Sequence, residues 1–179
     1  MKQILVVVDY QEDFVSGSLG FKRAEQLEEG IFQKVREFLG RGDSVFFTLD
    51  MHDADYLSTR EGQRLPVVHC LRDTDGARLY GRLKEFEQDT NVTMVAKDTF
   101  ASTELPAVIE RTCGVPDKIE ICGVVTNMCV ISNAVMLQAN FKNAQISILE
   151  TLCASFDEQM HNKAIDVLKS LHIDIVTQA

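Results

Sequence analysis

The sequence has few basic residues and no long hydrophobic run, and each absence excludes a class of protein. Its 18 Lys and Arg are outnumbered by 27 Asp and Glu, giving a net charge of −9. A negative surface repels phosphate backbones and anionic lipids, so nucleic acid is not an expected partner. The longest purely aliphatic run near the start, Ile4 to Val8, is far shorter than the roughly 20 residues that cross a membrane. No cleavage site of a signal peptide follows it, so we expect a cytoplasmic protein that makes no membrane contact.

Paired cysteines and phosphate-binding loops are also missing. The cysteines are odd in number and form no CxxC pair, which argues against a zinc knuckle or a complete disulfide framework. After the first apolar run the chain has only Ser16-Gly17-Ser18-Leu19-Gly20, not a G-x-G-x-x-G or Walker-type loop. Each cysteine must therefore be interpreted from its own surroundings. The five are Cys70, Cys113, Cys122, Cys129 and Cys153.

The chain length is typical of one domain. A chain of 179 residues buries roughly 70% of its unfolded surface, which is enough for one sizeable core. We see no repeat, low-complexity tract or linker that would divide it. We therefore predict a single domain over residues 1–179.

Short apolar runs alternate with segments of helical period, which predicts an α/β fold with a six-stranded, mostly parallel sheet. The predicted strands are Ile4 to Val8, Ser44 to Leu49, Asn91 to Ala96, Lys118 to Cys122, Gln145 to Leu149 and Ile173 to Val176.

Four helices are expected between these strands. The first, Ala24 to Leu39, carries an apolar stripe of Leu27, Ile31, Val35 and Phe38 and ends at Gly40 and Gly42. The second is Glu104 to Arg111 with Thr103 as its cap, and the third is Asn127 to Ala139 with Thr126 as its cap. The last begins at the capping-box pattern Ser155-Phe156-Asp157-Glu158, and its apolar face is Met160, Ile165, Leu168 and Leu171. His161 and His172 are expected on the surface.

One segment fits no element. Asp50 to about Tyr80 is polar and irregular, and loops of this length in compact domains are usually functional or disordered. We favour a functional loop.

Polar residues follow four of the predicted strands. Asp9, Asp50 and Lys97 come directly after the first three, and the fourth leads through Gly123 to Cys129. In open parallel sheets, ligands bind beyond the carboxyl ends of the strands. If these strands are neighbours, the four side chains converge there.

This combination suits acyl transfer. Cys129 falls in the first turn of a helix, where free N–H groups and the helix dipole favour the thiolate, and Lys97 adds a positive charge. Asp9 can take the thiol proton and later return it to a leaving amine. The N–H groups of the same turn can stabilise an oxyanion. Taken alone, each residue has a plainer interpretation, because such a cysteine is usually a small buried hydrophobe, a lysine is usually solvated and an aspartate often ends a strand.

Three segments carry a resemblance to a known family. Asp9-Tyr10-Gln11-Glu12-Asp13-Phe14, Lys97-Asp98-Thr99-Phe100 and Gly123-Val124-Val125-Thr126-Asn127-Met128-Cys129-Val130 together resemble the isochorismatase-like cysteine hydrolases, which include nicotinamidases. The resemblance implies a three-layer α/β/α fold, a catalytic triad of Asp9, Lys97 and Cys129, and a cis peptide between Val124 and Val125. The implied oxyanion hole comprises the N–H groups of Val125 and Cys129. Homo-oligomers are common among such relatives.

A metal site is a further expectation. Asp50 and His52 are two apart, with Glu61 and His69 further along the same loop, and such ligands suit a divalent ion such as zinc, iron or manganese. The spacing alone is a weak signal. The order resembles that of the metal ligands in nicotinamidases, which bind a metal through Asp-x-His and a later His, some with a Glu between them. In those enzymes the metal holds the pyridine nitrogen, so the pattern favours an aromatic amide as the substrate.

The pocket departs from the nicotinamidase pattern. Met51-His52-Asp53 replaces the usual Trp-His-Pro, the chain has no tryptophan, and Asn127 stands where an aspartate is usual. Phe14 keeps the position of an aromatic that stacks on the substrate ring. Phe14, Val124 and Asn127 are the predicted substrate contacts.

Three hypotheses remain open at this point. The first is a nicotinamidase-like amidohydrolase with a bound metal. The second keeps the triad but acts on another small amide or ureido compound without a metal. The third is a non-catalytic domain that binds a nucleotide or a protein partner.

Overall fold

The computed structural model describes residues 1–178 and contains a parallel sheet with the strand order β3-β2-β1-β4-β5-β6. All five strand pairings are parallel. The central strand is wholly apolar over Ile4 to Val8 and wholly buried, because helices cover both faces of the sheet. The predicted six-stranded sheet is confirmed. Its strands are β1 (Gln3–Val8), β2 (Ser44–Asp50), β3 (Val92–Lys97), β4 (Lys118–Val124), β5 (Gln145–Ala154) and β6 (Asp174–Val176).

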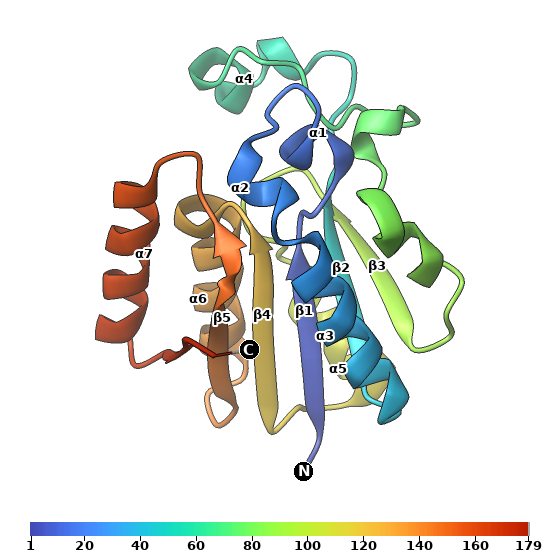
Figure 1. Cartoon of the computed structure of the whole chain (residues 1–179), viewed down its shortest axis with the longest axis vertical. Helices are drawn as coiled ribbons and strands as arrows, with labels where there is room; N and C mark the ends of the chain where they lie inside the picture. Colours follow the sequence, from blue (N-terminus) through green and yellow to red (C-terminus); the bar gives the residue numbers. More distant parts are fainter. Residues whose placement is uncertain (179) are drawn as a thin grey trace.

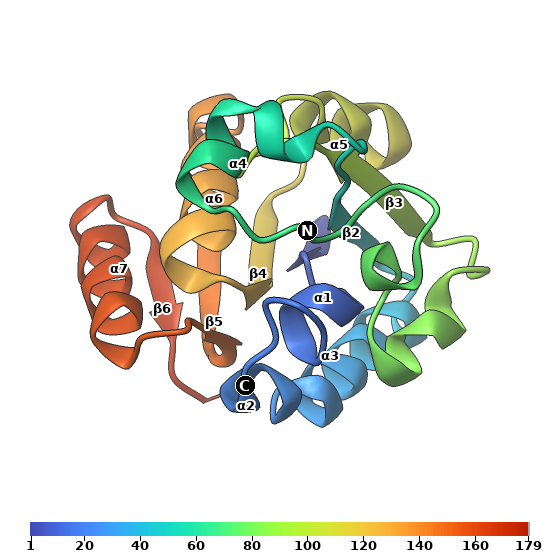
Figure 2. The same ribbon diagram turned by 90° about the horizontal axis from the view of Figure 1, so that it is seen from above.

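Helices form the outer layers of a three-layer α/β/α fold, as the resemblance implies. α3 (Glu28–Gly40) lies on one face of the sheet, and α5 (Leu105–Cys113) and α6 (Ile131–Asn140) lie on the other (Figures 1 and 2). The chain moves outward from β1 to β2 in one direction and from β4 to β5 in the other, so right-handed connections put their helices on opposite faces. α7 (Glu158–Ser170) packs against β5 and β6. None of the helices in the described part of the chain is long and apolar enough to cross a membrane.

β4 and β5 extend beyond their predicted ends. Their register shifts between Ile121 and Gly123, and pairing resumes at Gly123 with Cys153 and at Val124 with Ala154. Gly123 has a φ of +113°, and a Cβ atom there would lie 2.2 Å from the carbonyl oxygen of Val8. Glycine therefore lets the end of β4 approach β1 closely, at the edge of the sheet where the candidate residues gather.

The predicted helix over residues 24–39 is two helices. α2 (Lys22–Glu25) packs against β5, whereas α3 packs against β1 and β2, so the chain must change direction between them. The predicted apolar stripe is confirmed, since Ile31, Val35 and Phe38 are fully buried.

The three predicted N-caps are wrong. α5 begins after Glu104, and its first N–H group donates to Ser102 Oγ at 3.2 Å, not to Thr103. A π-helical turn, η4 (Thr126–Val130), precedes α6, so Thr126 lies inside the helical segment and does not cap it.

α7 begins at Glu158, and the side chain of Asp157 is its cap, not Ser155. The predicted apolar face of α7 is correct for Ile165 and Leu168 but wrong for Met160 and Leu171, which are 39% and 37% exposed. The sequence pattern has the right period there, but β5 and β6 cover only part of the stripe.

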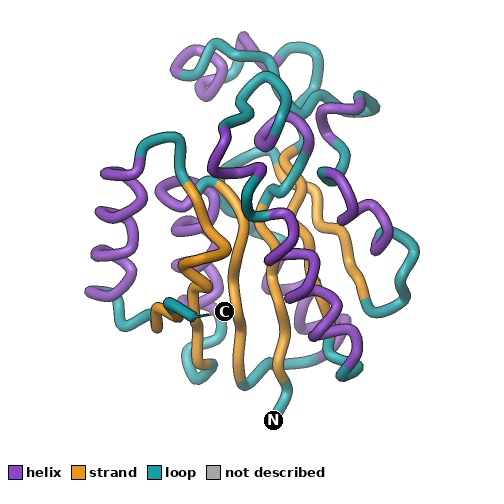
Figure 3. The backbone as a smooth tube through the Cα atoms, in the orientation of Figure 1, coloured by secondary structure: helices purple, strands orange, loops and turns teal. Residues whose placement is uncertain are grey.

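The long polar segment lies over the carboxyl ends of the strands. In Figure 1 it forms the top of the molecule, and Figure 3 shows that loops and short helices make up most of this end. It carries buried anchors such as Tyr56 and Leu79, which explains how a polar segment folds against the sheet. The short elements in and after it are η1 (Tyr56–Ser58), α4 (Arg60–Arg64), η2 (Asp75–Ala77) and η3 (Gly81–Phe86), and α1 (Glu12–Val15) lies beside them.

Candidate active site and metal centre

Side chains from the ends of three adjacent strands meet at one lysine. Lys97 closes β3, Asp50 closes β2 and Asp9 follows β1. Lys97 Nζ lies 2.6 Å from Asp9 Oδ2 and 3.1 Å from Asp50 Oδ1. The strand order brings them together, because β3, β2 and β1 are neighbours in the sheet.

Cys129 approaches the same lysine from the other side of β1. It lies in η4 after β4, only 4% exposed, and its Sγ atom is 3.8 Å from Lys97 Nζ. The peptide between Val124 and Val125, just before this turn, is cis, as the resemblance implies. The three residues predicted as a triad are therefore brought together in space.

Asp9 is held by a threonine that the sequence analysis missed. Thr48 Oγ1 donates a hydrogen bond to Asp9 Oδ1 at 2.6 Å, and the Asp9 N–H group donates to the Thr48 carbonyl at 3.1 Å. Asp9 has a φ of +47°, a conformation that aspartate tolerates better than most residues. The available signal was a threonine inside the otherwise apolar run of β2, and the structure shows that it is fully buried.

Burial controls the protonation of the cluster. Burial raises the pKa of Asp9, and the positive charge of Lys97 acts in the opposite direction. Burial also raises the pKa of the Cys129 thiol; the negative charge of Asp9 raises it further, whereas Lys97 lowers it. Burial also acts to lower the pKa of Lys97, but the neighbouring acidic groups outweigh it and keep the amine charged. Lys97 therefore lowers the pKa of the Cys129 thiol, as expected, but burial raises that pKa by more.

Asp9 and Cys129 compete for the positive charge of Lys97. A single lysine charge compensates one buried anion well, and Asp50 already uses part of it. A charged Asp9 beside a thiolate would leave a net negative charge in a buried site, which is costly. Asp9 and Cys129 can therefore exchange a proton but are not both ionised, and this is the arrangement that an acid and base pair needs.

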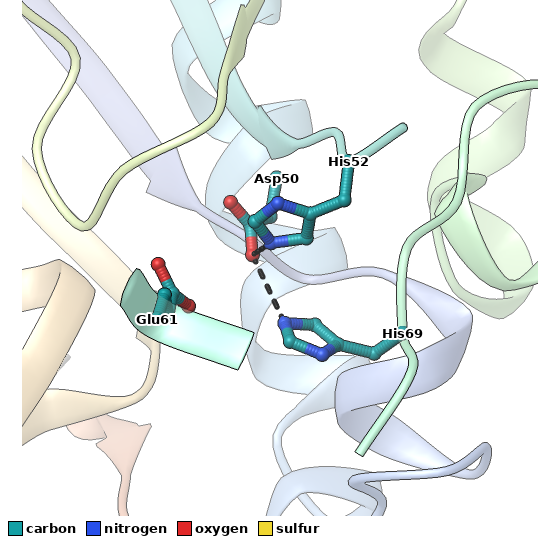
Figure 4. Close-up of side chains that lie close together, drawn as sticks. All are labelled: Asp50, His52, Glu61 and His69. Carbon is teal, nitrogen blue, oxygen red and sulfur yellow. Dashed lines mark hydrogen bonds and ion pairs between the residues drawn. The ribbon is translucent and has the colours of Figure 1, made fainter. Parts of the chain in front are cut away.

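A second cluster adjoins the first through Asp50. The ligand atoms of Asp50, His52, Glu61 and His69 all lie within 4.8 Å of one another. Asp50 Oδ2 is 3.0 Å from His52 Nε2 and 3.4 Å from His69 Nε2. Figure 4 shows the two imidazoles converging on the Asp50 carboxylate, with Glu61 of α4 facing them. The residues predicted from the loop spacing are thus brought together.

The hydrogen bonds of this cluster fit a bound cation. His69 Nδ1 donates to the Val67 carbonyl at 2.7 Å, so the lone pair of its Nε2 faces the Asp50 carboxylate. Two acceptors face each other stably only with a proton or a metal ion between them. Ligands around a tetrahedral ion are about 3.4 Å apart, close to both Asp50 separations. Carboxylate and imidazole donors suit zinc or a similar divalent ion.

The contacts between Asp50 and the two histidines also shift the pKa values of Asp50 and His69. Burial acts to raise the pKa of Asp50, but the hydrogen bonds with His52 and His69 outweigh it and hold the pKa well below its ordinary range. Burial acts to lower the pKa of His69, but Asp50 and the Val67 carbonyl raise it overall. The cluster therefore attracts positive charge.

Two further residues support the ligands. The Tyr56 ring packs 4.5 Å from the His52 ring and 4.9 Å from the His69 ring, measured between centroids. The fully buried Gln11 accepts from the Asp50 N–H group at 2.7 Å and donates to the Asp50 carbonyl at 2.8 Å. The sequence did not reveal either role, because Gln11 is 39 positions from Asp50 and the Tyr56 contacts depend on how the loop folds.

A cavity of about 870 Å³ opens beside Lys97 and the candidate metal cluster. His52, Glu61 and Lys97 supply polar groups to its wall. Asp9 and Cys129 are not among the lining residues. Lining residues that were not predicted as substrate contacts include Tyr56, Leu65, Ala96, Phe100 and Met128, together with Arg60 and Arg64 of α4.

The three predicted substrate contacts lie outside this lining. Phe14 and Val124 are buried, and the Phe14 ring packs 5.3 Å from the His69 ring. Asn127 accepts a hydrogen bond from Ser155 Oγ at 2.7 Å. Their contact with a substrate stays a prediction.

Asn133 joins the turn that carries Cys129 to the loop after β3. Its amide donates to the carbonyls of Cys129 at 2.8 Å and Phe100 at 2.9 Å, and its oxygen accepts from the Ser102 N–H group at 3.0 Å. It is fully buried on α6, four residues after Cys129. The segments that carry Lys97 and Cys129 are thereby held together on the side of the sheet covered by α5 and α6.

Known proteins share this arrangement of the chain. Residues 3–179 match the family described as Isochorismatase domain. An uncharacterised isochorismatase family protein, PncA of Bacillus subtilis (strain 168), is 31% identical over 176 residues, covering 92% of this chain and 93% of its own length.

Solved structures agree with the fold. The nicotinamidase/pyrazinamidase PncA from Bacillus subtilis matches with a TM-score of 0.88 and 29% identity, over 98% of this chain and all of that one. The pyrazinamidase of Pyrococcus horikoshii, solved in complex with zinc, matches with a TM-score of 0.85 and 24% identity, over 99% of this chain and all of that one.

Proposed function

The chain belongs to the isochorismatase family, and from this membership we propose that it is a cysteine-dependent amidohydrolase of the nicotinamidase type. It hydrolyses nicotinamide or a similar small amide to the acid and ammonia. One observation carries the proposal: Lys97 Nζ lies within 2.6 Å of Asp9 and 3.8 Å of the Cys129 sulfur. We also propose that residues 1–179 are a single domain, built on the one sheet.

The first half of the reaction forms a thioester. Asp9 takes the proton of the Cys129 thiol, and the sulfur attacks the amide carbonyl carbon. The backbone N–H groups of Val125 and Cys129 donate to the oxyanion. Asp9 then gives its proton to the departing nitrogen, the C–N bond breaks and ammonia leaves. Lys97 stays charged throughout and stabilises the Asp9 carboxylate.

The second half returns the enzyme to its starting state. Asp9, again a carboxylate, takes a proton from a water molecule, whose oxygen attacks the thioester carbon. The C–S bond breaks, the carboxylic acid leaves and Cys129 regains its proton from Asp9. Atoms and protons balance, because one water is consumed for each amide cleaved.

Asp50, His52, Glu61 and His69 are the residues that would hold a divalent ion, zinc foremost, with iron or manganese as alternatives. Such an ion supplies a Lewis-acidic contact for a ring nitrogen of the substrate. Because Asp50 also contacts Lys97, substrate anchored at this cluster lies beside the proposed triad.

Ammonia release tests the proposal. We expect the purified protein to release ammonia from nicotinamide or pyrazinamide, and Cys129→Ser to lower the rate by more than about a thousandfold, because the weaker nucleophile cannot form the thioester. Cys113→Ser is the matched control, since Cys113 is half-exposed at the far end of α5 and should not affect the rate. Normal turnover by Cys129→Ser would contradict the mechanism.

A second candidate is supported by the cavity. Its volume of about 870 Å³ falls near the upper end of the roughly 300–1,000 Å³ that hold drug-sized ligands, and nicotinamide is much smaller. The same triad would then act on a larger amide or ureido compound. A panel of amides of increasing size, assayed for ammonia, separates the candidates: a maximum at nicotinamide supports the first, and a maximum at a larger member supports the second.

A further inference from the structure

We infer that Asp13 is a positioning residue of the metal centre and acts through the backbone of Cys70. This inference rests on the metal site of the proposed function. Asp13 is half-buried in α1, and no part of the mechanism above uses it. It contacts none of the four proposed ligands directly. It contacts the backbone of Cys70, the residue after the proposed ligand His69.

The Asp13 carboxylate binds the residue that follows a ligand histidine. Asp13 Oδ2 accepts a hydrogen bond from the Cys70 N–H group at 2.7 Å, across 57 positions of sequence. Its other oxygen accepts from the Ser18 N–H group at 3.3 Å. Cys70 comes directly after His69, so the carboxylate holds the peptide unit that joins the two residues.

Cys70 links both ligand histidines. While its N–H group is held by Asp13, its carbonyl accepts a hydrogen bond from the His52 N–H group at 2.9 Å. The His52 carbonyl in turn accepts from Arg72 at 2.8 Å, which forms a short parallel bridge. A shift of Cys70 would therefore displace His69 through the covalent chain and His52 through the bridge.

The backbone of Cys70 needs such a partner. Its φ of +44° lies in the left-handed region that residues other than glycine rarely adopt, and its side chain is fully buried. A residue held in that region costs about 1–3 kcal/mol and persists only where its surroundings hold it there. The charged acceptor on its N–H group is the stronger kind of contact that does so here, beside the hydrogen bond that its carbonyl accepts from His52.

Gly76 shows how closely the loop packs on this carboxylate. A Cβ atom at Gly76 would lie 2.0 Å from Asp13 Oδ2, so any larger residue would have to displace the carboxylate. The position thus offers a way to move Asp13 away from Cys70 without changing Asp13 itself.

Zinc affinity of metal-stripped protein, measured by competition with a chromophoric chelator, tests the inference. Residues that orient metal ligands typically contribute 10–100-fold to metal affinity, so we expect Asp13→Ala to weaken zinc binding by roughly that factor. Asp13→Asn keeps an oxygen that can accept from Cys70 and should recover most of the affinity. Gly76→Ala should resemble Asp13→Ala, although Asp13 is present.

Glu12→Ala is the matched control, because Glu12 is the neighbouring carboxylate of α1 and pairs with Lys84 instead. It should bind zinc like the wild type. The melting midpoint of each metal-free variant separates general destabilisation from loss of the site, and Asp13→Asn and Gly76→Ala carry the test if Asp13→Ala does not fold. Wild-type zinc affinity in both Asp13→Ala and Gly76→Ala would overturn the inference and leave the metal centre standing. A wild-type protein that binds no zinc would overturn both.

Discussion

At the scale of single residues, the behaviour of the site depends on one buried cation. Lys97 contacts two carboxylates, and the thiol of Cys129 lies 3.8 Å from its amine. Its side chain is 2% exposed and that of Asp9 is not exposed at all, so solvent screens these charges little. Removal of the amine would leave the Asp9 and Asp50 carboxylates without the cation that they share.

Lys97→Met keeps the length of the side chain but removes its charge. Because Asp9 and Asp50 lose their common counterion, we expect the metal-free variant to lose about 3–5 kcal/mol of unfolding free energy, measured by urea denaturation. Lys84→Met is the control, since Lys84 pairs with Glu12 at the surface and such pairs contribute about 1 kcal/mol or less. Equal losses in the two variants would contradict the assigned role of Lys97.

Sequence alone identified the residues that follow strands but not those that support them. Asp9 and Lys97 are polar residues directly after apolar runs, and that position carries information without any knowledge of the partner. Thr48 and Asn133 lie within β2 and α6 and Gln11 directly before α1; all three are fully buried, and a buried polar residue indicates an internal hydrogen bond but not its target. Their partners lie on other elements of the fold.

At the scale of elements, the π-helical turn that carries Cys129 is supported by the last helix. The hydroxyl of the fully buried Thr126 is 2.9 Å from His161 Nδ1 of α7. His161 is half-buried, with Glu150 4.0 Å from its Nε2 atom. The prediction that His161 is an ordinary surface residue is therefore wrong, because α7 packs against η4.

His161→Ala removes the partner of this hydroxyl. A buried polar group left without a hydrogen bond costs about 1–3 kcal/mol, and we expect urea denaturation at pH 8 to show a loss of that size. Asn162→Ala, at the next and exposed position of α7, should show little change. A small effect at both positions would mean that water replaces His161.

The loss should also depend on pH. Burial lowers the pKa of His161, and Arg23 acts in the same direction, while Glu150 opposes. Below the ordinary histidine pKa of about 6.5, the unfolded chain therefore takes up this proton more readily than the folded protein does, which destabilises the folded state. The stability advantage of the wild type over His161→Ala should be largest above pH 7 and shrink as the pH falls below about 6.5.

At the scale of the whole molecule, the strand order determines where the site lies. β1 and β4 are neighbours, yet the chain leaves them in opposite directions, and ligands of such sheets bind at this point. Lys97, Asp50 and Asp9 lie on one side of it and Cys129 on the other. The segment after Asp50, as far as Tyr80, then covers this edge and adds the other three proposed metal ligands, His52, Glu61 and His69. Assembly into a homo-oligomer and a cytoplasmic location stay predictions.

Zinc should stabilise the folded chain as a unit, because the ligands converge only after folding. At a free zinc concentration about a hundred times the dissociation constant, binding adds about 2.7 kcal/mol, and the melting midpoint of a chain of this size should rise by roughly 5–10 °C. The shift should vanish in His52→Ala. It should persist in His172→Asn, where asparagine tolerates the φ of +62° at a position outside the cluster. A shift of the same size in His52→Ala would contradict the assigned metal site.

The sequence by itself determined the strands, the polar residues at their ends and the loop that carries the proposed metal ligands, because hydrophobic period and chain position are local properties. Its motifs also resemble a known family, and that resemblance implied the cis peptide and the proposed roles of Asp9 and Cys129. Only the tertiary structure decided which residues cap the helices, how the 24–39 segment divides, and which distant groups Thr48, Gln11, Asp13 and His161 contact. Those outcomes depend on which distant groups come within hydrogen-bonding distance, and that distance exists only once the sheet has formed.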